Sequence, residues 1–414
     1  MKESTRVLSA LGAAVATGLA IEVSGRPMLM QWADGVAPIG TLWVNAIRMT
    51  VIPLVVSLLI TGVTSAADVR EIGRMGRRTI ITFVGLLVFL SALVIPVMPS
   101  IFHLLPPSGS PPPLPAGAAE AAGQVTGSGQ AQSFGAWLVS LIPSNPIAAA
   151  ANGQMVPLVL FTFLLALAIA RGPAPARATL TGFFKSVGDV MLVLVRWVVL
   201  AAPIGVFALV LPLAAHAGES VVGAIGFYII TYMATCLLAS AALYPLVAMV
   251  ARVPMSAFAR AVLPAQLIAV SSSSSIASLP ALVEGAEQRL GLSKKVSGFV
   301  LPLAASTFKP ASPVSWSVGA LFVSWFYGIP LHAPQLGIIA FAAVFLAFAA
   351  PGVPRGAFIM LAPLFVAIGL PPEGIGILIA VDVIPDTCST VLNVTGDLAA
   401  AAIVARLEGE HVAT

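Results

Sequence analysis

The chain has 414 residues, of which 59% are hydrophobic and only 9% are charged. Soluble domains carry roughly a quarter of their residues as charges, so the mean hydropathy of +1.03 indicates a chain whose main solvent is lipid. This composition excludes a cytosolic enzyme, a nucleic-acid-binding domain and a secreted disulfide scaffold. The two cysteines, Cys236 and Cys388, lie in apolar segments and predict neither a disulfide framework nor a zinc site.

Apolar segments long enough to cross a bilayer recur along the chain; each crossing needs about 20 residues. The first segment follows Lys2 and Arg6 and has the composition of a signal peptide, but the many spans behind it favour a first transmembrane helix. A loop rich in Pro, Gly and Ser, 105–136, follows the third span. We expect eight transmembrane helices, near 7–24, 42–66, 79–104, 137–169, 188–213, 221–250, 296–326 and 374–405.

The placement of basic residues sets the orientation of these spans. Fifteen of the 20 Lys and Arg residues fall on the side of the N-terminus. Three (Arg26, Arg48 and Arg355) fall on the other side, and two (Arg196 and Lys309) fall inside spans. We therefore predict a multi-pass protein of the plasma (inner) membrane with both termini in the cytoplasm. The pI near 9.3 reflects this loop charge and predicts no nucleic-acid partner.

Two segments break the pattern of complete spans. Segment 261–293 is bounded by basic residues that belong on the same side, and its two apolar pieces, 261–270 and 276–283, each too short to cross the membrane, are separated by the serines at 271–275. Segment 336–372 has two apolar arms around 351–356. Irregular backbone at membrane depth is tolerated only where it is buried in protein or lines a cavity. We therefore predict two re-entrant hairpins.

Each hairpin precedes a long span with polar residues in its middle, helix 296–328 or helix 374–405. A hairpin followed by an interrupted helix occurs twice, with opposite entry sides, which makes an inverted repeat. In secondary transporters such segments meet near the membrane midplane and form the binding site. The predicted fold is therefore an all-α membrane protein with eight transmembrane helices, two re-entrant helical hairpins and inverted repeats.

Charged side chains inside a bilayer are costly and mark a pathway or a binding site. Asp386, Thr390, Asn393 and Asp397 have i, i+4, i+7, i+11 spacing, which places them in one stripe on a helix. Hydrogen bonding between helices also explains polar stripes, but two carboxylates on one face favour a binding site. Asp382, one turn earlier, has either this role or a packing or helix-end role.

Three further features have two interpretations each. The serines at 271–275 either offer hydroxyls and free amides to an anion or form a flexible linker, which is unusual between apolar arms. Lys309 either breaks its helix with the ammonium extending outward or pairs with Asp386 or Asp397 as an internal counter-ion. Arg355 is either an outer-surface charge or a carboxylate clamp.

Several motifs, in order, resemble the dicarboxylate/amino acid:cation symporter family, which includes glutamate transporters. Residues 141–146 and 151–157 are similar to its fourth-helix signature, and 393–397 to its last-helix signature. Gly352, Val353 and Pro354 resemble the tip of its second hairpin. The serine tip followed by Leu279-Pro280 resembles the first hairpin.

The resemblance implies a homotrimer in which each protomer moves a transport domain against a fixed scaffold, as in an elevator. The first two helices (1–78) and the fourth and fifth (137–213), which would form the trimer interface, belong to the scaffold. The third helix (79–104) and the core at 261–414 belong to the transport domain, and 214–260 is the sixth helix.

The resemblance also implies a substrate site. Asp386 would hold an α-amino group, and Asn393 with Asp397 would serve a sodium site. Together with Arg355, the residues expected at the substrate are Ser273, Ser274, Ser275, Ser312, Gly352, Val353, Pro354, Asp386, Ser389, Thr390 and Asn393.

The chain departs from the family pattern in three places. The seventh-helix motif Asn-x-Asp-Gly-Thr is replaced by Phe308-Lys309-Pro310-Ala311-Ser312, and a third-helix Thr-Ser pair by Leu86-Leu87. Hard cations need several oxygen ligands, so we expect sodium coupling to be weakened or lost, with the Lys309 ammonium facing Asp397. Ser389 replaces the arginine that reads a side-chain carboxylate, so the substrate need not be acidic.

We therefore predict a secondary active symporter for a small carboxylate-bearing solute, in the first place an amino acid. Sodium, a proton or exchange would drive it, with no other cofactor, and its surroundings would be membrane lipid. A C4-dicarboxylate transporter of the same family is the alternative. Two rivals belong to other classes: an anion channel, and an intramembrane serine hydrolase with Lys309 as the base of a Ser–Lys pair.

Overall fold

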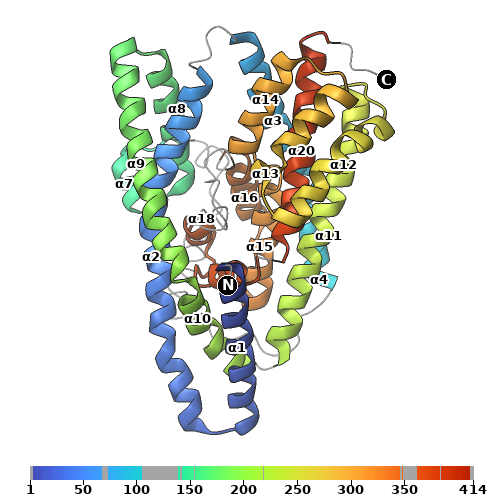
Figure 1. The fold of residues 1–414 in the computed structure, drawn as a ribbon. Coiled ribbons are helices and arrows are strands. Elements are labelled where there is room, and N and C mark those ends of the chain that lie inside the picture. The colour runs from blue at the N-terminus through green and yellow to red at the C-terminus, as the bar shows by residue number, and fades with distance from the viewer. Residues whose placement is uncertain are drawn as a thin grey trace.

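The computed structural model describes residues 3–67, 73–104, 139, 142–152, 154–217, 219–345, 347, 361–382 and 384–410. Within these residues the regular elements are all helices (Figure 1). In chain order they are α1 (Glu3–Ser24), α2 (Pro27–Ala67), α3 (Gly73–Val94), α4 (Met98–Leu104), α7 (Pro146–Ala151), α8 (Met155–Arg171), α9 (Ala174–Leu200), α10 (Ala202–Ala217), α11 (Glu219–Val250), α12 (Met255–Ser272), α13 (Ser275–Glu284), the π-helix Gly285–Arg289, α14 (Lys294–Thr307), α15 (Ser312–Tyr327), α16 (Ala333–Phe345), α18 (Leu361–Ile368), α19 (Gly374–Val381) and α20 (Asp386–Leu407).

In the described part of the chain, seven helices are long and apolar enough to cross a membrane. These seven helices differ from the eight expected spans because some of the expected spans are divided or too short. The expected helix 296–328 is divided into α14 and α15, neither of which reaches 18 residues, and α8 has only 17. Conversely, the first arm of hairpin 261–293 was expected to be too short to cross. That expectation is wrong in length, because α12 begins at Met255 and has 18 residues.

Helix α2 is much longer than the predicted span 42–66. It begins at Pro27 and continues for 41 residues, which corresponds to about 60 Å, twice the thickness of the hydrocarbon core. Proline is favoured at the first helical position, where its missing N–H has no helical partner. The residues from 27 to 41 lack the long apolar run of a span, so hydropathy placed the start too late.

Two expected single helices are interrupted beside a proline, and the two helices predicted to be interrupted have a proline in the break. The expected span 79–104 becomes α3 and α4, with a turn at Pro96, and the span 188–213 becomes α9 and α10, with a break beside Pro203. Pro310 and Pro385 lie in the breaks before α15 and α20. Proline removes a backbone donor and clashes with the carbonyl four residues earlier, which explains the breaks.

Helices α1, α2, α9 and α10 form one group, on the left of Figure 1. Small residues allow their backbones to approach: a Cβ on Gly18 would lie 2.4 Å from Ala214 Cβ, and one on Gly205 would overlap the Trp43 ring. Trp43 also donates from Nε1 to the Val198 carbonyl at 2.9 Å. Close packing of this kind is how helices associate in lipid.

The second group surrounds α20, which packs against α3, α11, α12, α13 and α14 (Figure 1). The α20 segment is 94% buried within the protein although it is apolar enough to span a membrane. Helices α12 and α13 form an antiparallel hairpin; a Cβ on Gly285, at the end of α13, would lie 2.2 Å from the Ala261 carbonyl oxygen. The α20 helix is thus the centre of the region that carries the predicted site.

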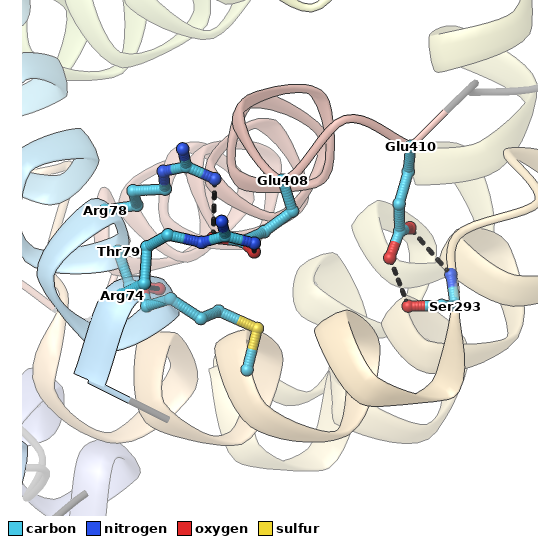
Figure 2. Close-up of polar contacts among 7 residues, drawn as sticks. Arg74, Arg78, Thr79, Ser293, Glu408 and Glu410 are labelled. Carbon is cyan, nitrogen blue, oxygen red and sulfur yellow. Dashed lines mark hydrogen bonds and ion pairs between the residues drawn. The ribbon is translucent and has the colours of Figure 1, made fainter. Parts of the chain in front are cut away.

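Ion pairs and hydrogen bonds fix the C-terminal end of α20 to its neighbours (Figure 2). Arg78 and Arg74 of α3 bind the Glu408 carboxylate at 2.9 and 3.1 Å. Glu410 accepts from the Ser293 amide at 3.0 Å and from its hydroxyl. Partial burial raises the pKa of Glu408, but hydrogen bonds from Arg78 and Arg74 outweigh it, so the net pKa lies below the usual value.

Candidate substrate-binding site

The serine tip connects α12 to α13. Ser273 is the C-cap of α12 in the left-handed conformation, with φ +48°, and this reverses the chain. Ser274 is the N-cap of α13, and its hydroxyl accepts from the Ala277 amide at 3.2 Å. Ser273 Oγ lies 3.5 Å from Oγ1 of Thr387. The tip is therefore beside the first turn of α20, next to Asp386.

The break between α14 and α15 is docked on the middle of α20. Phe308 is in the extended conformation at the end of α14. The Ala311 amide, in the break, donates to Asn393 Oδ1 at 2.9 Å. Gly396 makes the close approach possible, since a Cβ there would lie 2.3 Å from Pro310 Cγ. The Asn393 side chain of α20 thus accepts a hydrogen bond from a backbone amide that lies in the break between α14 and α15.

The predicted polar stripe is present on α20, and its members have different environments. Ser389 donates to Asp386 Oδ1 at 3.0 Å, and Thr390 donates to the Asp386 carbonyl at 2.8 Å. Thr390 and Asp397 are 3% and 0% exposed, whereas Asp386 and Asn393 are partly accessible. The accessible end of the stripe is the end beside the serine tip. Asp382, just before it, is the buried C-cap residue of α19.

Lys309 points back along its own helix. Its Nζ donates to the Ala305 carbonyl, in the last turn of α14, at 2.8 Å. The ammonium makes no hydrogen bond to Asp397, whose two carboxylate oxygens have no hydrogen-bond partner among the described residues. The counter-ion role of Lys309 stays a prediction.

The residues that replace the expected sodium ligands form an apolar cluster. The Phe308 ring stacks on Phe83 of α3, with centroids 4.3 Å apart and planes 7° from parallel. Pro310 packs on Gly396, and Leu86 and Leu87 are buried. These side chains offer no oxygen to a hard cation, which prefers carboxylate, carbonyl and water oxygens. The cluster does not fit a sodium ion.

Part of the predicted site lies outside the described residues. These are Gly352, Val353, Pro354 and Arg355, together with Leu141 and Gly153 of the fourth-helix signature. The arms of the second predicted hairpin are described in part, and α16 packs against α18. Ser312 is described: its hydroxyl is buried and has no hydrogen-bond partner within the described chain.

Sequence reasoning missed several polar side chains around the stripe. Gln266 of α12 donates to Tyr244 Oη at 3.1 Å and to Thr395 Oγ1 at 2.9 Å, which ties the hairpin to α11 and α20. Tyr232 and Ser315 share a hydrogen bond of 2.5 Å between α11 and α15. Gln266 could have been found as an amide inside an apolar arm. The tyrosine is indistinguishable in sequence from a packing aromatic.

A model of the sodium:dicarboxylate symporter family matches residues 4–407. The chain belongs to this family. It is 28% identical to the proton/glutamate-aspartate symporter of Escherichia coli, over 90% of this chain and 85% of that one. It is 29% identical to the proton/sodium-glutamate symport protein of Bacillus subtilis (93% and 88% covered). It is 27% identical to the C4-dicarboxylate transport protein of Azorhizobium caulinodans (90% and 83%).

Membership in the family confirms the resemblance seen in the motifs. The family consists of symporters of dicarboxylates and related solutes, so this chain is a transporter and not an enzyme. The hydrolase alternative is therefore excluded. The apolar helices of the chain agree with an integral, multi-pass membrane protein. An anion conductance, the other rival, stays a prediction.

Proposed function

We propose that this protein is a secondary active transporter of a small amino acid, bound between the α12–α13 serine tip, the α14–α15 break and the first half of α20. The contact between Ser273 and Thr387 carries the proposal, because it brings the hydroxyls and turn of the tip to the first turn of α20, which begins at Asp386. A carboxylate at one end and donor groups at the other suit the two charged ends of an amino acid.

Asp386 is the group proposed to bind the α-amino group. A charge-assisted hydrogen bond in a partly desolvated site is about twice as strong as a neutral one. The Ser389 hydroxyl donates to the same carboxylate and carries no charge with which to bind a substrate's second carboxylate. We therefore propose a neutral amino acid as the preferred substrate.

A C4-dicarboxylate is the second candidate, favoured by the name of the Azorhizobium relative. It would use Arg355 as its carboxylate clamp. The coupling ion is proposed to be a proton, or transport is exchange, in keeping with the proton named for the E. coli and B. subtilis relatives. We further propose a homotrimer in the plasma membrane with both termini cytoplasmic.

We propose an elevator-type movement from the division of the helices into two groups. The α1–α2–α9–α10 group would be the fixed scaffold, and the group around α20 would carry the site. The two hairpins would be re-entrant, with α12–α13 reaching the site from the side of the C-terminus. Cross-linking of cysteine pairs placed between the groups, with and without substrate, tests this movement.

Uptake into proteoliposomes tests the substrate. Vesicles loaded with unlabelled alanine receive labelled alanine outside, and alanine, serine, aspartate and succinate compete. We expect alanine and serine to compete best, and Asp386→Asn to lower the rate of uptake strongly while Asp189→Asn, at an exposed carboxylate of α9, leaves it unchanged. Stronger competition by succinate would refute the amino-acid assignment.

A further inference from the structure

Asp397 is the most deeply buried carboxylate on the α20 stripe. It is 0% exposed, and neither Oδ1 nor Oδ2 has a hydrogen-bond partner in the described part of the chain. A buried charge without a partner is strongly destabilising. A symporter has an obvious solution, which is to bind its coupling cation against such a carboxylate.

Three oxygens near Asp397 that could serve as ligands of a metal cation each already accept a hydrogen bond. The Asn393 side-chain oxygen accepts from the Ala311 amide. At the end of α14, the Ala304 carbonyl accepts from the Phe308 amide and the Lys309 carbonyl from the Ser312 amide. These carbonyls matter because half-helix ends and unwound backbone supply cation ligands in many transporters.

The remaining side chains at the break are apolar and close-packed. Phe308 is 0% exposed and stacked on Phe83. Pro310 fills the space above Gly396, where even one added carbon would overlap the ring. A hydrated or partly hydrated ion has neither room nor ligands in this contact.

A cation is nevertheless present, because the chain supplies it. The Lys309 ammonium binds the Ala305 carbonyl at the C-terminal end of α14, where the helix dipole favours positive charge. Pro310, the residue after Lys309, packs on Gly396, the residue before Asp397, so this end of α14 lies against the part of α20 that carries the carboxylate. The ammonium thus binds a helix-end carbonyl in the same contact region as a buried carboxylate that has no hydrogen-bond partner in the described residues.

We propose that the Lys309 ammonium is a tethered cation that takes the place of a coupling sodium ion at Asp397, so that substrate moves without sodium. The inference rests on the proposed function, since it concerns the coupling of that transport. A tethered cation cannot dissociate on either side of the membrane. The charge balance at Asp397 is therefore the same in both directions, and exchange of one substrate molecule for another needs no ion gradient.

Thermal unfolding of the purified protein tests the proposal without reference to any substrate. A ligand that binds the folded state raises the unfolding midpoint, so the midpoint is compared in sodium chloride and choline chloride at equal ionic strength. We expect equal midpoints for the natural protein. A sodium-dependent rise, or binding of radioactive sodium, would overturn the proposal.

Variants at Lys309 separate charge compensation from simple loss of folding. Lys309→Met should lower the midpoint by several degrees, and Asp397→Asn in addition should recover most of the loss, because the carboxylate no longer needs a partner. Lys309→Arg should resemble the natural protein, and Lys295→Met, at an exposed lysine of the same helix, is the matched control. Purely additive effects of the Lys309 and Asp397 changes would also overturn the proposal.

A gain-of-function variant completes the test. Phe308→Asn, Lys309→Met and Pro310→Asp together return an amide and a carboxylate to the break, and this triple variant should show a midpoint that rises with sodium. If no amino acid is transported by the natural protein under any gradient while its midpoints behave as stated, the proposed function fails and the tethered cation stands. Sodium-driven accumulation of an amino acid would support the proposed function and overturn the tethered cation.

Discussion

The chain interrupts two helices near α20, and the two interruptions have opposite charge. Between α14 and α15 the break spans 308–311 and contains Lys309; between α19 and α20 it spans 382–385 and is bounded by Asp382 and Asp386. Each contains a proline. A helix break with a proline thus occurs twice. The break at 308–311, here called the basic joint, is closed by apolar packing, and the break at 382–385 with the start of α20, here called the acidic joint, is partly accessible beside the serine tip.

The two joints differ in packing and in accessibility, and we expect them to have different roles. At the basic joint the backbone is held by Asn393 and the rings of Phe308 and Pro310 leave no space, so this joint is structural and electrostatic. At the acidic joint, Thr387 Oγ1 lies 3.5 Å from Ser273 Oγ at the tip, and Asp386 is partly accessible. Changes at the acidic joint should therefore impair transport most, whereas changes at the basic joint should impair stability as well as transport.

The largest effect is expected at the acidic joint. Asp386→Asn keeps the shape and removes the charge that binds the α-amino group. A hydrogen bond to a charged group contributes about 1.5–3 kcal/mol, so kcat/KM for exchange should fall by about 100-fold. The measurement is initial-rate exchange in proteoliposomes, with the unfolding midpoint recorded in parallel. A variant that unfolds but exchanges normally when folded would reverse the assignment of the two joints.

Gly396→Val should be the most damaging change at the basic joint. Its Cβ would overlap Pro310, and relieving that overlap separates the break from α20, at a cost of about 3 kcal/mol. Chemical denaturation in detergent measures the free energy of unfolding. Gly298→Val on α14 is the control, because a Cβ there meets nothing within 4 Å. Equal losses in both would show that helix propensity, and not the close contact, is responsible.

Asn393→Leu removes the acceptor of the Ala311 amide and leaves the shape roughly intact. The unsatisfied donor should lower the free energy of unfolding by about 1–3 kcal/mol. Asn393→Ser keeps an acceptor without adding a charge beside Asp397 and should be milder. The same denaturation experiment distinguishes them, and a Leu variant as stable as the natural protein would mean that water replaces the amide.

The smallest effect is expected away from both joints, at Glu408. Its pKa is lowered in the folded protein, so its contribution to stability is present above the unfolded-state pKa, about 4.3 for glutamate, and is lost as the pH falls through the lower folded-state pKa. Glu408→Gln should therefore be less stable than the natural protein at neutral pH and equally stable at strongly acidic pH. Exposed Glu284, changed to Gln, should show no such pH dependence.

Sequence alone identified the elements whose signals are local. The serine run predicted the α12–α13 tip, the i, i+4, i+7, i+11 stripe predicted one face of α20, and the Phe308–Ser312 segment predicted a helix break. The start of α2 and the proline breaks in α3–α4 and α9–α10 were missed, because hydropathy averages over a window and is insensitive to single residues. The partners of Gln266 and Tyr232 depend on tertiary packing, which spacing along one helix cannot reveal.

The anchoring of the C-terminal end of α20 has a mechanical consequence. Glu410 holds Ser293, at the base of α14, and Arg289 donates to the Arg260 carbonyl across the base of the α12–α13 hairpin. From this fixed base α12 extends 18 residues to the serine tip, a length of about 27 Å. A rotation of one degree at the base moves the tip by about 0.5 Å, which is simple geometry on that length. A rotation of a few degrees about this base is therefore enough to change a contact distance at Ser273 by about the width of an atom.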